Sequence, residues 1–353
     1  MGYPSSVTRR FLLRSAAGVV AGVGLAAPGI VRAAEFPTSG WATASPASVG
    51  LDLAGLQEGQ RFAEQYGGAG CVIRHGRVAH VWGSFDERYQ VQSTTKSWGS
   101  AVLGMALDEG RLALGDRARD HLPDLGAIPA SNLETGWLDG ITIDHLATHT
   151  SGFPFPSGYS ELETAPGTRW IYSNCGSNWL SNVLTRSFGQ DLRELTRTRL
   201  FGPLGLTDDD VRWRTPAIFF KEPVDGLPAT EFNGGMLANV DAMARLGMLF
   251  LHGGNWDGKQ VLSRSFIELA TTPSYARQPF RTTRRYGLLW WSNVTGRMPD
   301  VPPDAFYSAG KNANHTIVIP SLDLIVVRVG NDGWTEDGGR LASFLQPIVD
   351  AAR

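Results

Sequence analysis

Ser93-Thr94-Thr95-Lys96 is the stretch from which the organisation of this chain can be worked out. The serine and the lysine are three residues apart, which places both on one face of a helix. Apolar residues then recur at helical spacing, at Ala101, Val102, Met105 and Ala106. We therefore predict a helix that ends near Gly110 and carries Ser93 in its first turn.

A serine in the first turn of a helix is well placed to act as a nucleophile. Free backbone N–H groups and the helix dipole favour negative charge there, so Ser93 can attack a carbonyl while its own N–H holds the oxyanion. Lys96 can take the proton if desolvation lowers its pKa. The spacing alone is a weak signal, because an ordinary helix start with an exposed lysine has it too. A second copy, Ser308-Ala309-Gly310-Lys311, precedes Asn312 and predicts a hairpin turn instead.

The first 33 residues are set apart from the rest. Thr8-Arg9-Arg10-Phe11-Leu12-Leu13 precedes an apolar run rich in glycine and alanine, and Ala33 follows it. This pattern resembles a twin-arginine export signal and predicts a periplasmic or secreted protein cleaved near Ala33. A basic disordered tail or a retained membrane anchor is the alternative. No other run is long and apolar enough to cross a bilayer.

Composition narrows the class of protein further. Of the 353 residues, 42% are apolar and 19% charged, which is typical of a globular protein. Residues 1–33 contain four arginines and no acidic residue, so the remainder is acidic and does not indicate nucleic acid as a partner. Cys71 and Cys175 form no metal-ligand pattern. In an exported protein these two cysteines could form a disulfide. We favour two buried free thiols, because twin-arginine substrates generally fold in a reducing cytosol.

Strand patterns lie at both ends of the chain, with helical patterns between them. The predicted strands are Cys71–Arg74, Arg77–Trp82, Tyr286–Trp291, Phe306–Ala309, Thr316–Ile319 and Leu324–Val329. The other predicted helices are Leu51–Tyr66, Asp144–Thr148, Cys175–Ser187, Asp191–Leu200, Val240–Leu251, Ser265–Thr271 and Leu341–Ala351.

This pattern predicts an α+β fold: an antiparallel sheet flanked by helices, built from both chain ends, with an inserted, mostly helical domain. We expect a linker at 34–50, a sheet domain from 51–92 plus 256–353, and a helical domain at 93–255. The cleft between the two domains is the expected place for chemistry.

Tyr172-Ser173-Asn174 is the second motif whose residues could take part in catalysis. A tyrosine and an asparagine two apart in an extended loop point the same way. A lysine cation nearby favours the ionised form of a tyrosine, so Tyr172 can act as base or acid. Asn174 can orient Lys96 and hydrogen-bond a substrate carbonyl. A buried tyrosine with a satisfied hydroxyl is the alternative.

Other candidates are weaker. The strand start Tyr307–Gly310 has backbone N–H groups that can complete an oxyanion hole, or it is a plain edge strand. His149 is expected to be structural and hydrogen-bonded near the site, because the chain has no G-x-S-x-G elbow. His315 is expected to lie at the surface or to line a pocket. Asp208–Asp210 is expected to be a solvated loop, and no metal site is predicted.

Ser93-x-x-Lys96, Tyr172-x-Asn174 and the strand near Ser308, in this order, resemble the serine β-lactamase and penicillin-recognising enzyme superfamily. The Tyr-x-Asn form is similar to the class C branch, with its D-alanyl-D-alanine peptidases, carboxylesterases and 6-aminohexanoate-dimer hydrolase. Four further stretches are similar to that branch: ATHTSG (147–152), PGTRWIYSN (166–174), FGPLGL (201–206) and IVIPSLDLIVVRVG (317–330).

The resemblance implies roles for these residues. Ser93 would be the acylated nucleophile, Lys96 and Tyr172 would share proton transfer, and Asn174 would position Lys96 and the substrate. The oxyanion hole would combine the N–H of Ser93 with one near Gly310-Lys311, and water would attack the acyl-enzyme. No metal or organic cofactor is implied.

One position departs from the family pattern. The third motif is typically Lys-Thr-Gly, or has His first, and its cation helps bind a carboxylate; here Ser308-Ala309-Gly310 aligns with it. The missing cation fits an uncharged ester or amide better than a β-lactam-like substrate. Several aromatic residues flank the motifs and suit an apolar pocket: Trp98, Phe153, Phe155, Trp170 and Phe219-Phe220.

Our hypothesis is an exported serine hydrolase for small esters or amides, with Trp170, Phe153 and His315 as possible pocket residues. The alternatives are a β-lactamase or D-alanyl-D-alanine carboxypeptidase, and a non-catalytic binding or sensor protein with the same fold.

Overall fold

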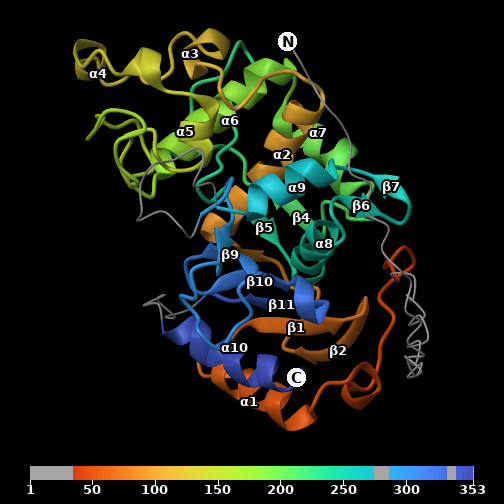
Figure 1. Cartoon of the computed structure of the whole chain (residues 1–353). Coiled ribbons are helices and arrows are strands. Elements are labelled where there is room, and N and C mark those ends of the chain that lie inside the picture. Colours follow the sequence, from red (N-terminus) through yellow and green to blue (C-terminus); the bar gives the residue numbers. More distant parts are fainter. Residues whose placement is uncertain (1–34, 274–285, 332–338, 353) are drawn as a thin grey trace, which may run out of the picture. The chain divides into compact units, whose positions relative to one another are not determined.

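A six-stranded antiparallel sheet contains strands from both ends of the chain in the computed structural model, which describes residues 35–273, 286–331 and 339–352 (Figure 1). Its order is β2-β1-β11-β10-β9-β8. The strands are β1 (Ala69–Arg74), β2 (Arg77–Trp82), β8 (Trp291–Ser292), β9 (Phe306–Gly310), β10 (Asn314–Ile319) and β11 (Leu324–Val329). The predicted sheet built from both chain ends is therefore confirmed.

Two local turns explain the pairing. His75 and Gly76, with φ of 54° and 74°, form the two-residue turn that pairs Arg74 with Arg77 in the predicted β1–β2 hairpin. Asn312 and Ala313, also at positive φ, reverse the chain between β9 and β10.

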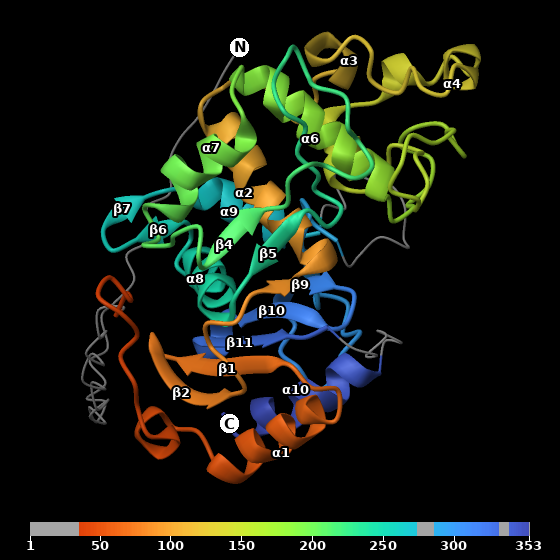
Figure 2. The ribbon, with the colours of Figure 1, turned by 180° about the vertical axis from the view of Figure 1, so that it is seen from behind.

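Each face of the sheet is covered by helices. Alternate residues of β11 separate into two cores, with Val326 on one face and Val327 on the other. The Val326 face packs against α1 (Leu53–Glu64) and α10 (Arg340–Asp350), and the Val327 face packs against α8 (Val240–Leu251). Both views show α1 and α10 side by side on one side of the sheet (Figures 1 and 2).

Helix α2 (Thr95–Asp108) is buried along nearly its whole length, from Thr95 to Ala106. A helix buried on every side has apolar side chains or hydrogen-bonded polar ones all around, and it lies at the centre of a domain. It contacts α6 (Asn174–Phe188), α9 (Arg264–Thr271) and strand β9. The remaining helices are α3 (Ala118–His121), α4 (Ser131–Glu134), α5 (Ile143–Ala147) and α7 (Leu192–Thr196).

Two small sheets accompany the helices and were not predicted. They are β3-β5-β4 and β6-β7, from β3 (Tyr89–Gln90), β4 (Val211–Trp213), β5 (Met236–Ala238), β6 (Asn255–Trp256) and β7 (Lys259–Gln260). Strands of two or three residues are too short to produce a recognisable alternation in sequence.

The prediction of a strand over Tyr286–Trp291 is wrong. The chain turns back on itself there: Gly287 N–H donates to Trp290 O at 2.8 Å, and Leu289 has a φ of 62°. Only Trp291 and Ser292 join the sheet. An apolar run of this length fits a buried turn as well as a buried strand, which explains the error.

Segment 35–50, predicted as a linker, is tied to the domain. Trp41 Nε1 donates to the Asp241 carboxylate on α8 at 2.5 Å, and Arg245 donates to Pro37 O at 2.9 Å. By its contacts, 34–353 forms one compact unit. The division into a sheet domain and an inserted helical domain stays a prediction.

Strand β9 lies directly against the turn that contains Ser93. An added Cβ on Gly310 would lie 2.2 Å from Val91 O and 3.1 Å from Thr94 Oγ1. The Thr94 hydroxyl also donates to Asn314 O at 2.6 Å, on the neighbouring strand β10. Position 310 must therefore be glycine for the strand to approach this closely.

Gly310→Ala is expected to lower the free energy of unfolding by about 1–3 kcal/mol, because the methyl group forces the strand away from a backbone carbonyl. Urea denaturation measures the change. Gly115→Ala is the matched control, since an added Cβ there meets nothing within 4 Å. Equal stability of the two variants would contradict the close approach.

Candidate active site

Ser93 lies in a single 3₁₀ turn, Gln92–Thr94, that leads directly into α2. Gln92 has a φ of 53°, a conformation that costs a non-glycine residue about 1–3 kcal/mol and is found mainly where function or packing requires it. Thr95 Oγ1 donates to Gln92 O at 2.6 Å and fixes the turn. Ser93 Oγ donates to the backbone carbonyl of Asn233 at 3.2 Å.

Lys96 is only 1% exposed, and its ammonium nitrogen meets three oxygen atoms. Nζ lies 2.6 Å from Asn174 Oδ1, 3.1 Å from Asn233 O and 3.2 Å from Ser93 Oγ. None of these three partners is a carboxylate. The structure thus brings Ser93, Lys96 and Asn174 together, as the sequence predicts.

Burial lowers the pKa of Lys96 well below its ordinary value, because the charged form loses its hydration. In the neutral amine, the two N–H groups donate to Asn174 Oδ1 and Asn233 O. The remaining lone pair then faces Ser93 Oγ, 3.2 Å away, and accepts the hydroxyl proton when that proton turns from Asn233 O toward Nζ. This is the arrangement that a general base needs toward a nucleophile.

Tyr172 completes the group of four. The Lys96 nitrogen lies 4.9 Å from the centre of the tyrosine ring. Burial raises the pKa of Tyr172 to about 12, and a hydrogen bond with Ser93 acts in the opposite direction. We expected the lysine cation to favour the ionised phenol, and this is wrong, because burial drives both groups toward their neutral forms. Tyr172 is therefore suited to donate a proton rather than to remove one.

His149 holds the segment that carries Tyr172. Its backbone carbonyl accepts from Ile171 N–H at 2.9 Å, and its ring Nδ1 accepts from Ser173 N–H at 3.2 Å. Burial lowers the pKa of His149 well below its usual value, which keeps Nδ1 free of a proton and able to accept. The expected structural role beside the site agrees with these contacts.

Aromatic rings surround Tyr172 and form what we call the aromatic cluster: Phe155, Trp170, Tyr172, Tyr286 and Trp291. Trp291 stacks on Tyr172 at 5.9 Å with an interplanar angle of 16°. Phe155 lies 6.0 Å from Tyr172 and is 63% exposed, which is unusual for a phenylalanine. Trp170, a predicted pocket residue, belongs to this cluster.

Two other predicted pocket residues lie elsewhere. Phe153 is fully buried in the core, 6.4 Å from Trp179, where burial of the whole ring is most favourable. His315 is also fully buried and packs 6.3 Å from Tyr307, on the α1–α10 face of the sheet. Its neighbour Thr316 donates to Met243 O on α8, so strand alternation turns His315 away from Ser93. Neither residue lines the site.

The third motif occupies the end of β9. Ser308 is fully buried and its hydroxyl accepts from Thr316 N–H at 2.9 Å. Ala309 pairs with His315 and is part of the opposite face. Lys311 is exposed and lies beyond the strand end, where its carbonyl accepts from Asn314. Ser308, which the sequence analysis aligns with the cation of the third motif, is therefore buried and uncharged. The oxyanion role of the Gly310-Lys311 backbone stays a prediction.

The sequence analysis missed Asn233. Its backbone carbonyl accepts from both Ser93 Oγ and Lys96 Nζ. A main-chain carbonyl leaves no signature in residue type. The adjacent Gly234-Gly235 pair is a signal that could have indicated an unusual backbone at this point.

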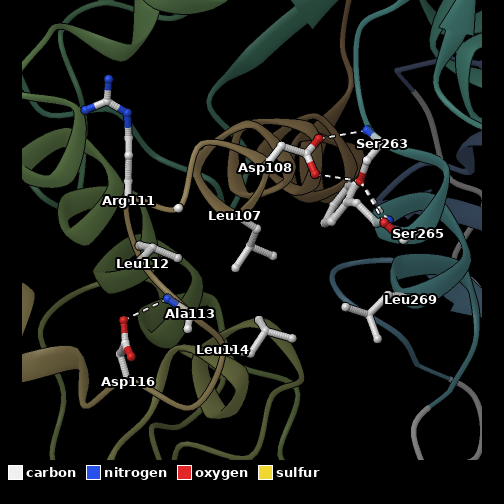
Figure 3. A pocket seen from close by; sticks show the side chains of 12 residues that line it. Leu107, Asp108, Arg111, Leu112, Ala113, Leu114, Asp116, Ser263, Ser265 and Leu269 are labelled. Atoms are coloured by element: carbon white, nitrogen blue, oxygen red, sulfur yellow. Dashed lines mark hydrogen bonds between the residues drawn. The ribbon is translucent and has the colours of Figure 1, made fainter.

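A cavity of about 660 Å³ lies away from these residues, between the end of α2 and α9 (Figure 3). Leu107, Leu114 and Leu269 line it, and the Asp108 carboxylate accepts there from Ser263 N–H at 2.7 Å. It contains none of the predicted catalytic residues.

Within 35–273, 286–331 and 339–352, no group of three or more His, Cys, Asp or Glu is placed to hold a metal. Cys71 and Cys175 are buried and not bonded to each other. No helix in the described part of the chain has the length and apolar character needed to span a membrane.

A family model described as Beta-lactamase matches residues 56–345. The chain belongs to the beta-lactamase family. Among curated proteins, it is 27% identical over 183 residues to the D-alanyl-D-alanine-carboxypeptidase/endopeptidase AmpH of Escherichia coli, a match that covers 46% of this chain and 45% of AmpH. The chain therefore matches less than half of that relative's length.

Solved structures share the fold along most of the chain. A family VIII carboxylesterase superposes with a TM-score of 0.67 at 16% identity, covering 88% of this chain and 99% of the other. A penicillin-binding protein homologue from Caulobacter crescentus superposes with a TM-score of 0.65 at 17% identity, covering 86% and 99%. At these identities the likeness shows the fold alone.

Lys96 is expected to lose its proton well below the pH at which a lysine ordinarily does, because burial penalises its charge. NMR titration of protein labelled with ¹³C at lysine Cε measures this directly. The chain has only four lysines (Lys96, Lys221, Lys259 and Lys311), so Lys96→Arg assigns the signal. A Lys96 midpoint near 10.4, the ordinary value, would contradict its role as a neutral base.

Proposed function

We propose that the protein is an exported serine hydrolase that cleaves small, uncharged ester or amide substrates through an acyl-enzyme on Ser93. The observation that carries the proposal is the buried Lys96 nitrogen, 3.2 Å from Ser93 Oγ and bonded to two carbonyl oxygens. Membership of the beta-lactamase family supports the same chemistry.

Acylation begins when neutral Lys96 removes the Ser93 proton as Oγ attacks the substrate carbonyl. The Ser93 N–H is one donor to the oxyanion, and an N–H near Gly310-Lys311 is the proposed second donor. The proton then passes from Lys96, by way of the Tyr172 hydroxyl, to the leaving oxygen or nitrogen. In the second half of the cycle, water attacks the resulting ester as Lys96 takes a proton from it. The bond between Ser93 Oγ and the acyl carbon then breaks, the acid is released, and Lys96 returns the proton to Oγ. Asn174 keeps Nζ aimed at Ser93 throughout.

The aromatic cluster supports an apolar substrate group. Phe155 and Trp291 offer ring surface beside Tyr172, and such surface binds acyl chains or aromatic leaving groups. Ser308 offers no positive charge for a carboxylate. The similarity in fold to a carboxylesterase is in keeping with this substrate class.

A D-alanyl-D-alanine carboxypeptidase or β-lactamase is the second candidate, favoured by the sequence similarity to AmpH. The buried Ser308 at the position of the family's cation argues against it, since both activities act on substrates with a carboxylate. A non-catalytic binding protein is disfavoured by the assembled contacts of Ser93, Lys96 and Asn174.

Export is proposed from the twin-arginine pattern around Arg9 and Arg10, which lies outside the described residues. Amino-terminal sequencing of protein recovered from the periplasm of expressing cells tests it. A chain recovered intact from the cytoplasm alone would count against export.

Ser93→Ala is expected to abolish hydrolysis of p-nitrophenyl butyrate, because the nucleophile is removed. Lys96→Ala and Tyr172→Phe should each lower kcat by about 10²-fold or more, the scale of acid–base assistance. Steady-state kinetics of the purified variants measures these losses.

The turnover of nitrocefin and of a peptide ending in D-alanyl-D-alanine is measured with the same purified protein. Faster turnover of either one than of the ester would support the second candidate instead. Unchanged ester hydrolysis in Ser93→Ala would contradict both.

Phe155→Ala should raise KM roughly 10-fold for esters with an aromatic or long acyl group, since about 1.4 kcal/mol of apolar contact is lost, and should leave kcat nearly unchanged. The matched control is Phe219→Ala, another phenylalanine that is 43% exposed. We expected Phe219 to suit an apolar pocket as well, but in the described part of the chain its ring is not among those that contact the aromatic cluster. Kinetics with acetate and phenylacetate esters of p-nitrophenol measure the difference. An equal effect on the two esters, or in the two variants, would show that Phe155 does not select the acyl group.

A further inference from the structure

Helix α6 presents a buried polar side to the site. Asn174 and Asn178 are one turn apart, so they share a face of the helix. Asn174 is 8% exposed and Asn178 is fully buried. Asn174 holds Lys96 directly, whereas the side-chain hydrogen bonds of Asn178 go to Asn233 and Ser157. The role of Asn178 is therefore not explained by the proposed function.

Both ends of the Asn178 amide are hydrogen-bonded. Its Oδ1 accepts from Asn233 N–H at 3.0 Å, and its Nδ2 donates to Ser157 O at 3.0 Å. One partner is a donor and the other an acceptor, so only one orientation of the amide satisfies both. A leucine would fill similar space without the desolvation that a buried amide requires. Asn178 therefore fixes the position of the Asn233 backbone by a specific hydrogen bond to its N–H group.

The backbone at Asn233 in turn sets the geometry of the nucleophile and the base. Its carbonyl is 3.2 Å from Ser93 Oγ and 3.1 Å from Lys96 Nζ. In the described part of the chain, the Asn233 carbonyl is the only hydrogen-bond partner of Lys96 that also accepts from the Ser93 hydroxyl. A rotation of this carbonyl would release one N–H of Lys96 and misdirect the lone pair.

The segment before Asn233 is fastened along the same helix. Ser181 Oγ, on α6, donates to Thr230 O at 2.6 Å. From the other side, the buried Glu231 carboxylate accepts from Phe220 N–H at 2.9 Å and from Arg214 at 2.8 Å. Thr230 and Glu231 are held by these bonds. Asn178 then fixes Asn233, the residue whose carbonyl reaches Ser93 and Lys96.

We propose that Asn178 is a positioning residue for Lys96, acting through the Asn233 carbonyl. This inference rests on the proposed function, in which neutral Lys96 is the base. Together, Asn174 and Asn178 hold the two acceptors of the Lys96 N–H groups, one directly and one through the backbone. The geometry of the base is therefore set by a single face of α6.

Asn178→Leu is the central variant, and Asn182→Leu is its matched control. Asn182 lies one turn further along α6 and is 4% exposed. Among the described residues, the α6 side chains that hydrogen-bond to the segment before and at Asn233 are Ser181 and Asn178, not Asn182. The ¹³C titration of Lys96 and the kinetics of p-nitrophenyl butyrate are measured for both variants. Thermal unfolding confirms that each is folded.

Asn178→Leu is expected to move the Lys96 midpoint down by about one pH unit, because the ammonium loses an acceptor. Neutral Lys96 is the active form, so the acid limb of kcat/KM moves to lower pH by the same amount. Misalignment should lower the plateau of kcat roughly 10- to 100-fold with KM nearly unchanged. Asn182→Leu should change none of these quantities.

Asn178→Asp separates the two hydrogen bonds of the amide. The carboxyl keeps an acceptor for Asn233 N–H, so it should recover most of the kcat that Asn178→Leu loses. If the contact with Ser157 were the important one, Asn178→Asp would be as slow as Asn178→Leu, and the proposal would be overturned. This variant also decides the question if Asn178→Leu does not fold.

Identical Lys96 midpoints and kcat values in Asn178→Leu and Asn182→Leu would show that Asn178 only supports the fold. The NMR titration does not depend on ester turnover. If the wild-type protein hydrolyses no ester, the proposed function fails, while the Lys96 midpoint in Asn178→Leu still decides whether Asn178 positions the amine.

Discussion

The burial of the Lys96 amine is the constraint on which the rest of the site depends. An ammonium without hydration is costly unless its hydrogens are bonded, and a neutral amine in the same place is a strong base. Its three partners come from separate parts of the chain: the 3₁₀ turn, helix α6 and the Asn233 segment. The site therefore exists only when these three parts are packed together.

Helix α2 connects this amine to the substrate side of the site. Its hydroxyls at Ser97 and Ser100 donate to Leu289 O and Leu288 O, at 2.9 and 2.7 Å. Those carbonyls belong to the turn that leads into Trp291, a member of the aromatic cluster. The helix that presents the base therefore also fixes the apolar wall beside Tyr172, so a shift of one would misplace the other.

Local spacing made much of this predictable. Ser93 lies in the turn that leads directly into α2, where Lys96 lies, and Tyr172 is two residues before Asn174, the first residue of α6. Short spacing in sequence therefore placed each pair, and the alternating strands at both ends of the chain indicated the sheet. Long-range facts could not be predicted. The direction of His315 depends on strand register, and the Asn233 carbonyl leaves no trace in residue type. The protonation of Tyr172 depends on the burial of its own ring by residues from distant parts of the chain.

Covalent capture tests the central claim most directly. The purified protein is treated with a fluorophosphonate at a series of pH values, and the modified peptide is identified by mass spectrometry. Our account predicts a single adduct on Ser93, formed at a rate that rises with pH through the depressed pKa of Lys96 and is lost in Lys96→Ala. An unlabelled Ser93, or a labelling rate unaffected by the loss of Lys96, would contradict it.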